Sequence, residues 1–221
     1  MRILGVKLPL DAFRWDLIYL LAQLTSDDRS GIAELAPAVQ TGLDEVNDCR
    51  NAWEQAQAAA IVTSALVAKR DRGRDRLIIE MGGIARAMER AMYEQLFPRL
   101  SPSRTAELGI ESETSEVQRL LGELNRLEDR HPLRQGYETS LRAAQSSLQA
   151  AKAQDDSADT ALELQRSNVR RVKMNIDRLR LETHGKLLAL LADKAEADAF
   201  FRPTQSAPGQ TEDKDEQEPG G

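Results

Sequence analysis

The sequence is poor in several residue types, and each shortage excludes a class of protein. A single cysteine, Cys49, rules out an intramolecular disulfide framework and is typical of a reducing compartment. Aromatic residues make up only 4% of the chain. The apolar residues are mostly Ala and Leu, which favours helices over sheets. We interpret Cys49 as a small core residue, because no catalytic partner lies near it in the sequence.

Long apolar runs are also missing. Lys7, Asp11, Arg14 and Asp16 interrupt the apolar N-terminus, so no segment reaches the ~18 residues of a membrane span. A secretory leader would need a continuous apolar run of about 7–15 residues and a cleavage site, and neither is visible. These observations predict a cytoplasmic protein that does not bind membranes.

The chain has no excess of positive charge. Its formal net charge is −6, and the last residues carry five acids against Lys214, which leaves −2 for the rest. Residues 204–221 are rich in Gly, Pro and Gln besides these acids, which predicts a disordered acidic tail. Nucleic-acid binding therefore has no support from the overall charge.

Motifs of common enzymes are absent as well. The chain has no Gly-rich phosphate loop, Gly-x-Ser-x-Gly elbow, Cys-x-x-Cys pair or His-Glu-x-x-His segment. Glu128-x-x-His131 has the spacing of a helical metal site, but it stands beside Pro132 at a helix end. Glu80 and Glu182 each follow an Arg by four residues, which is typical of surface ion pairs. We therefore expect no enzyme activity, no cofactor and no metal.

Helical periodicity dominates what remains. We predict a helix over 11–25 with Asp11 as N-cap, in which Phe13, Trp15 and Tyr19 pack against the core. A long helix then begins at a capping box, Thr41-Gly42-Leu43-Asp44, and runs to Phe97-Pro98. Gly73 and the pair Gly82-Gly83 are its weak points, where we expect bending.

Further helices follow. Ser101-Pro102 predicts the N-cap and first residue of a short helical turn, and Ser115 is predicted to cap a third helix that ends near Arg130. A second long stretch spans about 133–200. Asp155–Asp159 could instead form a hairpin, because these side chains favour caps and turns.

These patterns predict an all-α fold. Two long amphipathic helices should pack antiparallel in a coiled-coil-like pair, with short flanking helices, in one domain over 1–203. The alternative is a compact four-to-six-helix bundle. Asp75-Arg76-Leu77-x-x-Glu80-x-x-Gly83 recurs as Asp177-Arg178-Leu179-x-x-Glu182-x-x-Gly185, which suggests an internal duplication with halves 11–98 and 113–203.

Basic residues gather in each long stretch and are the strongest candidate site. The residues that could hold an anion or an acidic partner, including the chain's own tail, are Lys69, Arg70, Arg72, Arg74, Arg76, Arg166, Arg170, Lys173 and Arg178. Interleaved acids and the absence of stacking aromatics favour a solvated face over a nucleic-acid site.

Taken together, the sequence favours a non-enzymatic helical scaffold or adaptor that binds an unknown protein partner or associates with itself. Polyanion or nucleic-acid binding through the arginines is the first alternative. A helical-bundle metal enzyme built on Glu80, Glu182 or Glu128 with His131 is the second.

Overall fold

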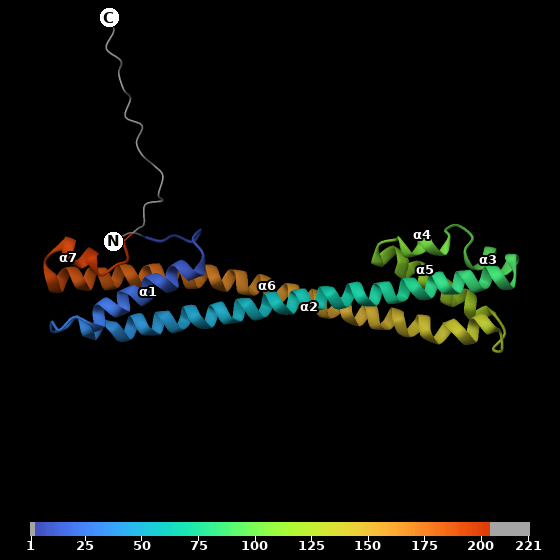
Figure 1. Ribbon diagram of the computed structural model, residues 1–221, viewed down its shortest axis with the longest axis horizontal. Coiled ribbons are helices and arrows are strands. Elements are labelled where there is room, and N and C mark those ends of the chain that lie inside the picture. Colours follow the sequence, from blue (N-terminus) through green and yellow to red (C-terminus); the bar gives the residue numbers. More distant parts are fainter. Residues whose placement is uncertain (1–2, 204–221) are drawn as a thin grey trace, which may run out of the picture. The chain divides into compact units, whose positions relative to one another are not determined.

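The computed structural model describes residues 3–203, and this part of the chain is helical without any strand. The order of elements is α1 (Leu10–Thr25), the 3-10 helix η1 (Ala33–Leu35), α2 (Ala36–Met88), α3 (Arg90–Leu96), α4 (Pro102–Ala106), α5 (Ile110–Arg126), α6 (Pro132–Leu191) and α7 (Lys194–Ala199) (Figure 1). The predicted all-α class is confirmed. The predicted disordered tail, 204–221, lies outside the described residues.

Both long helices are continuous. Helix α2 has 53 residues and passes through Gly73 and the Gly82-Gly83 pair, and α6 has 60 residues and passes through Asp155–Asp159. Asp155 is engaged, because its Oδ1 accepts a hydrogen bond of 2.8 Å from the Thr63 hydroxyl on α2. The chain does not turn back at these places, so the alternative prediction of a compact bundle and the prediction of a hairpin at Asp155–Asp159 are both wrong.

Several helix starts differ from the prediction. Helix α1 begins after Pro9, and Asp11 lies inside its first turn instead of capping it. Helix α2 begins at Ala36 instead of Thr41, because Pro37 in the first turn gives up an N–H that has no partner there anyway. Helix α5 begins at Ile110, and Ser115 lies inside it.

The predicted cap at Ser101-Pro102 is confirmed. The Ser101 hydroxyl accepts a hydrogen bond of 3.3 Å from the Arg104 amide, and Pro102 is the first residue of α4. The proline lies close to α2, since a Cβ placed on Gly82 would be 2.1 Å from its Cγ. Glycine at position 82 therefore allows the close approach of α4 to α2.

The chain divides into two compact units, and each takes part of both long helices. Unit 1 comprises Met1–Asn51 and Asn168–Gly221, and unit 2 comprises Ala52–Ser167. In both units the segments of α2 and α6 run antiparallel: Asn175 bonds to Glu45 in unit 1, and Gln145 bonds to Arg74 in unit 2. The predicted halves 11–98 and 113–203 each contribute to both units, and the duplication itself stays a prediction.

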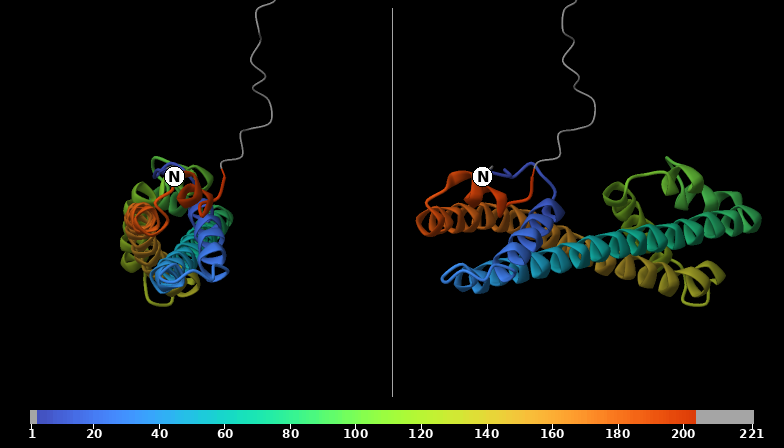
Figure 2. Two further views of the ribbon diagram at one scale, coloured as in Figure 1. Left: turned by 90° about the vertical axis from the view of Figure 1, so that its left-hand side faces the viewer. Right: turned by 60° about the vertical axis from the view of Figure 1, so that its left-hand side comes forward.

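In unit 1, α1 packs against the beginning of α2 and the end of α6 (Figure 2). Spacing of three and four residues puts the apolar side chains of α1 on one face. The core of unit 1 is formed by Phe13, Leu17, Leu20, Leu24, Val39, Val46, Cys49, Val172, Ile176, Leu187, Phe200 and Phe201, among others. Cys49 is buried, as predicted, whereas Trp15 is half exposed and Tyr19 only partly buried.

Unit 2 has the same kind of organisation, with α5 packed on the end of α2 and the beginning of α6. Its core contains Ile78, Met81, Ala85, Leu96, Phe97, Val117, Leu120, Leu121, Leu124, Leu133 and Leu141. In each unit one helix of 16 or 17 residues, α1 or α5, packs on the beginning of one long helix and the end of the other. Within residues 3–203 no helix has both the length and the apolar character that crossing a bilayer requires.

Candidate functional site

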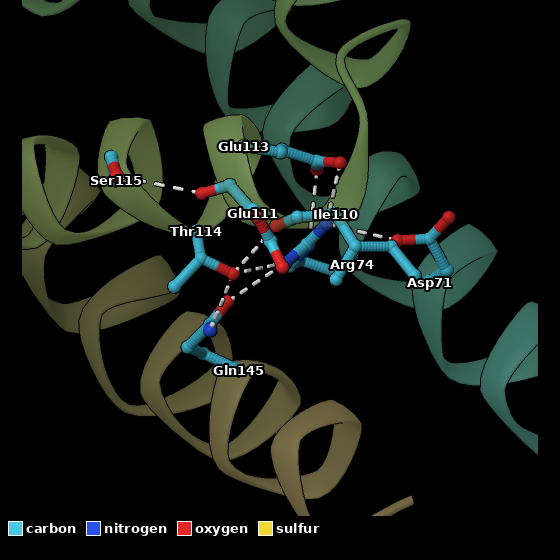
Figure 3. A network of polar contacts seen from close by, with 8 residues as sticks. All are labelled: Asp71, Arg74, Ile110, Glu111, Glu113, Thr114, Ser115 and Gln145. Atoms are coloured by element: carbon cyan, nitrogen blue, oxygen red, sulfur yellow. Dashed lines mark hydrogen bonds and ion pairs between the residues drawn. The ribbon is translucent and has the colours of Figure 1, made fainter. Parts of the chain in front are cut away.

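A fully buried arginine stands at the centre of unit 2 (Figure 3). Arg74 on α2 donates from Nε to Glu113 Oε1 on α5 at 3.0 Å, and its Nη2 lies 2.5 Å from Glu113 Oε2. The same guanidinium reaches Asp71 at 2.9 Å, Gln145 on α6 at 2.9 Å and the Thr114 hydroxyl at 3.3 Å. One side chain therefore ties together α2, α5 and α6.

Glu113 shares this site with a second carboxyl group, Asp75. Burial is the main cause that raises the pKa of Glu113 to about 7, and a hydrogen bond with Asp75 adds to it while Arg74 opposes it. Burial raises the pKa of Asp75 in the same way. Asp75 Oδ1 is buried, and no group that the structure describes in residues 3–203 donates a hydrogen bond to it in the unprotonated form. One proton held between the two carboxyl groups supplies that donor and removes a charge from the interior.

The carboxylates could in principle hold a cation. One oxygen each from Asp71, Asp75 and Glu113 lie within 4.8 Å of one another, and carboxylate oxygens are the ligands that hard divalent ions prefer. The Arg74 guanidinium, however, already binds two of the three groups and would repel a second cation. We interpret this cluster as an internal charge network of the protein.

The acids weighed for an enzyme site do not come together. Glu80, Glu182 and Glu128 are all exposed, and Glu80 lies in unit 2 while Glu182 lies in unit 1. His131 Nδ1 accepts a hydrogen bond of 3.2 Å from the Leu133 amide at the start of α6. This histidine therefore has a role at a helix terminus.

Unit 1 contains a parallel network around Arg180 on α6. Its Nε lies 2.5 Å from Asp16 Oδ2 on α1, and its Nη1 lies 2.9 Å from Asp177. Asp177 also accepts hydrogen bonds of 3.0 Å from the amides of Leu4 and Gly5. Burial raises the pKa of Asp16 although Arg180 opposes the shift. In both units a buried arginine follows an aspartate by three residues. Each arginine also bonds to an acid on another helix, α5 in unit 2 and α1 in unit 1.

The sequence analysis missed both networks. The shared signal is an Asp three residues before an Arg, Asp71 before Arg74 and Asp177 before Arg180. The recurring segment noted in the sequence aligns Asp177 with Asp75, whereas the two networks align Asp177 with Asp71, four residues earlier.

The predicted basic residues are dispersed over the two units. Lys69, Arg70, Arg72, Arg76 and Arg166 are exposed in unit 2, and Arg170 and Arg178 are exposed in unit 1. Arg166 pairs with Glu163, and the half-buried Lys173 donates to the carbonyl of Val6 at 3.2 Å. Arg74, which was predicted as part of the anion site, is fully buried and so cannot reach an external partner.

An exposed apolar surface is the most prominent feature of unit 2 outside its core. From Ala52 to Gly73 no residue of α2 is buried, and from Lys152 to Ser167 no residue of α6 is buried. Ile61 and Val62 on α2 are 70% and 66% exposed, and Leu164 on α6 is 67% exposed. An open groove beside Ile61 is lined by Gln57, Ala60, Ile61, Ser64, Ala65 and Leu162. Leu164 does not line this groove, because it lies about 200° around α6 from Leu162. We call Ile61, Val62 and Leu162 with this groove the apolar face.

Comparisons of the chain with protein-family models, with curated proteins and with solved structures find no match.

Proposed function

We propose that the protein is a non-enzymatic helical scaffold that binds protein through the apolar face of unit 2. The observation that carries this proposal is the exposure of Ile61 and Val62, which are 70% and 66% accessible, beside the groove that Ile61 shares with Leu162. Burying a large aliphatic side chain stabilises by about 1.5–3 kcal/mol, so a protein partner gains free energy at each of these positions. A contiguous exposed apolar surface on a protein marks an interaction site.

The form of the long helices supports the same function. In unit 2 the buried core and the Arg74 network hold α2 and α6, and the apolar face lies on segments of the same two helices. A rigid helical surface loses little conformational entropy when it binds a partner. Such a surface suits a protein that holds another protein in place.

An affinity experiment with paired variants tests the proposal. The full chain, Ile61→Glu with Val62→Glu, and Ile84→Glu serve as baits, and the retained proteins are identified. Ile84 is 44% exposed on the same helix of unit 2 but lies outside the apolar face, which makes it the matched control. We expect the wild type and the control to retain the same proteins and the double variant to lose them. Equal retention by all three baits would contradict the proposal.

A second function, polyanion binding, is favoured by one specific observation. Lys69, Arg70, Arg72 and Arg76 are all exposed within a short segment of α2. Four cations in close sequence can bind phosphate or sulfate groups with an affinity that falls steeply with salt. Retention on heparin at low ionic strength that is lost in Lys69→Ala with Arg72→Ala would support this function. No retention of the wild type would remove it.

A further inference from the structure

The centre of α2 has a stretch without any charge. Residues 55–68 read QAQAAAIVTSALVA and lie between Glu54 and Lys69. Over this stretch the helix covers about 21 Å, because each residue of an α-helix advances the axis by about 1.5 Å. Uncharged helix surface of this length is typical of a buried helix.

The structure does not bury this stretch. None of its residues is fully buried. Leu66 and Val67 are partly buried, whereas Ile61 and Val62 are 70% and 66% exposed. The contact with α6 at this level includes a polar bond, from the Thr63 hydroxyl to Asp155. The stretch therefore has apolar surface that the described chain leaves uncovered.

We propose that the occupant of this surface is a second copy of the same chain, whose residues 55–68 pack antiparallel against residues 55–68 of the first. This inference rests on the proposed function and names the partner. Ile61 and Val62 lie at the middle of the stretch. A two-fold axis near them brings these side chains of the two copies together, as in an isologous dimer interface.

Charge complementarity selects the antiparallel direction. Glu54 precedes the stretch, and Lys69 and Arg72 follow it; all three side chains are exposed. In an antiparallel pair centred between Ile61 and Val62, Glu54 of each copy lies opposite the second copy's Lys69. A parallel pair would instead place Lys69 and Arg72 against the same cations of the second copy, which is repulsive.

Small side chains permit the close approach that such a pair needs. Ala58, Ala65 and Ala68 are exposed and lie with Ile61 on one face of α2, at spacings of three and four residues. The distance between packed helices, about 8–10 Å, is shortest where the contacting side chains are small. In the antiparallel pair Ala58 of each copy lies opposite the second copy's Ala65.

Sedimentation equilibrium of the full chain over a concentration series tests whether the pair forms. We expect a reversible dimer, a dissociation constant raised about 30-fold or more in Ile61→Glu, and little change in the matched Ile84→Glu. Far-UV circular dichroism checks that both variants are folded. A wild type that stays monomeric at every concentration, or a dimer that Ile61→Glu leaves intact, overturns the inference.

Disulfide cross-linking tests the direction. In a Cys49→Ala background, Ile61→Cys should cross-link with itself, and Glu54→Cys should cross-link only with Lys69→Cys in a mixture of the two variants. Efficient self-cross-linking of Glu54→Cys or of Lys69→Cys overturns the antiparallel arrangement.

The outcomes also separate this inference from the proposed function. A monomeric chain that still retains other proteins through the apolar face overturns the second copy as partner and leaves the scaffold intact. A chain that neither dimerises nor retains proteins through this face contradicts both.

Discussion

Arg74 and Glu113 form an ion pair in which neither side chain has any exposed surface, although 39 residues separate them in the sequence. Removal of two charges from water is unfavourable, and only good geometry with further hydrogen bonds compensates for it. Arg74 meets this condition through Asp71, Gln145 and Thr114. The pair fixes α5 on α2 at one position.

Arg74→Ala should therefore destabilise the protein by about 3–5 kcal/mol, because it leaves buried carboxylates without their counter-charge. Urea unfolding followed by circular dichroism measures this change. The exposed neighbour Arg72 provides the control, and Arg72→Ala should stay within about 0.5 kcal/mol of the wild type. Equal effects of the two variants would contradict the assigned role.

The raised pKa of Glu113 predicts a dependence of stability on pH. Its pKa is about 7 in the folded chain against an ordinary value of 4.5. Between pH 4.5 and about 7 the folded state therefore binds more protons than the unfolded state. The contribution of Glu113 to the free energy of unfolding is therefore full below pH 4.5 and is lost as the pH rises to about 7. Glu113→Gln should flatten this slope in urea unfolding between pH 5 and 8, and Glu111→Gln, exposed on the same helix, should not.

Two adjacent glycines of α2 should respond to alanine in opposite directions. A Cβ at Gly82 would lie 2.1 Å from Pro102 Cγ, whereas a Cβ at Gly83 meets nothing within 4 Å. Gly82→Ala should destabilise by about 1–3 kcal/mol through overpacking. Gly83→Ala should stabilise by about 1 kcal/mol, since alanine restricts the unfolded chain and favours helix. Thermal unfolding of both variants decides this, and a stabilising Gly82→Ala would refute the contact.

Asp177 should protect the N-terminal segment from hydrogen exchange. Its carboxylate accepts the amides of Leu4 and Gly5, each at 3.0 Å. Asp177→Ala should speed the exchange of these two amides by about tenfold or more, because the bonds that hold them closed are lost. Glu182→Ala, exposed on the same helix, should leave their exchange rates unchanged. The measurement is hydrogen exchange resolved to single amides by NMR.

Periodicity of apolar residues was enough to predict the main helices and the all-α class. Helix starts were harder, because Thr41 and Ser115 carry capping patterns yet lie inside helices that began earlier. Trp15 was misplaced because it lies about 200° around α1 from Phe13, outside the buried face.

The buried networks could not be predicted from local patterns. Arg74 stands among exposed cations from Lys69 to Arg76, and nothing in this run distinguishes it from its neighbours. Its burial depends on α5, which brings Glu113 from a distant part of the chain. Runs of basic residues are usually exposed to solvent. This rule does not hold for Arg74, because its contact with Glu113 buries it.

The division of the long helices between two units has a consequence for the order of folding. Unit 2 is one continuous segment, Ala52–Ser167, whereas unit 1 joins Met1–Asn51 to Asn168–Gly221. During synthesis the ribosome releases all of unit 2 before the C-terminal part of unit 1, which begins at Asn168, has been made. Domains fold as their sequence becomes available, and contacts between distant segments form slowly. The core around Phe13 and Leu17 of α1 therefore stays incomplete until the end of α6, with Val172, Ile176 and Leu187, has emerged.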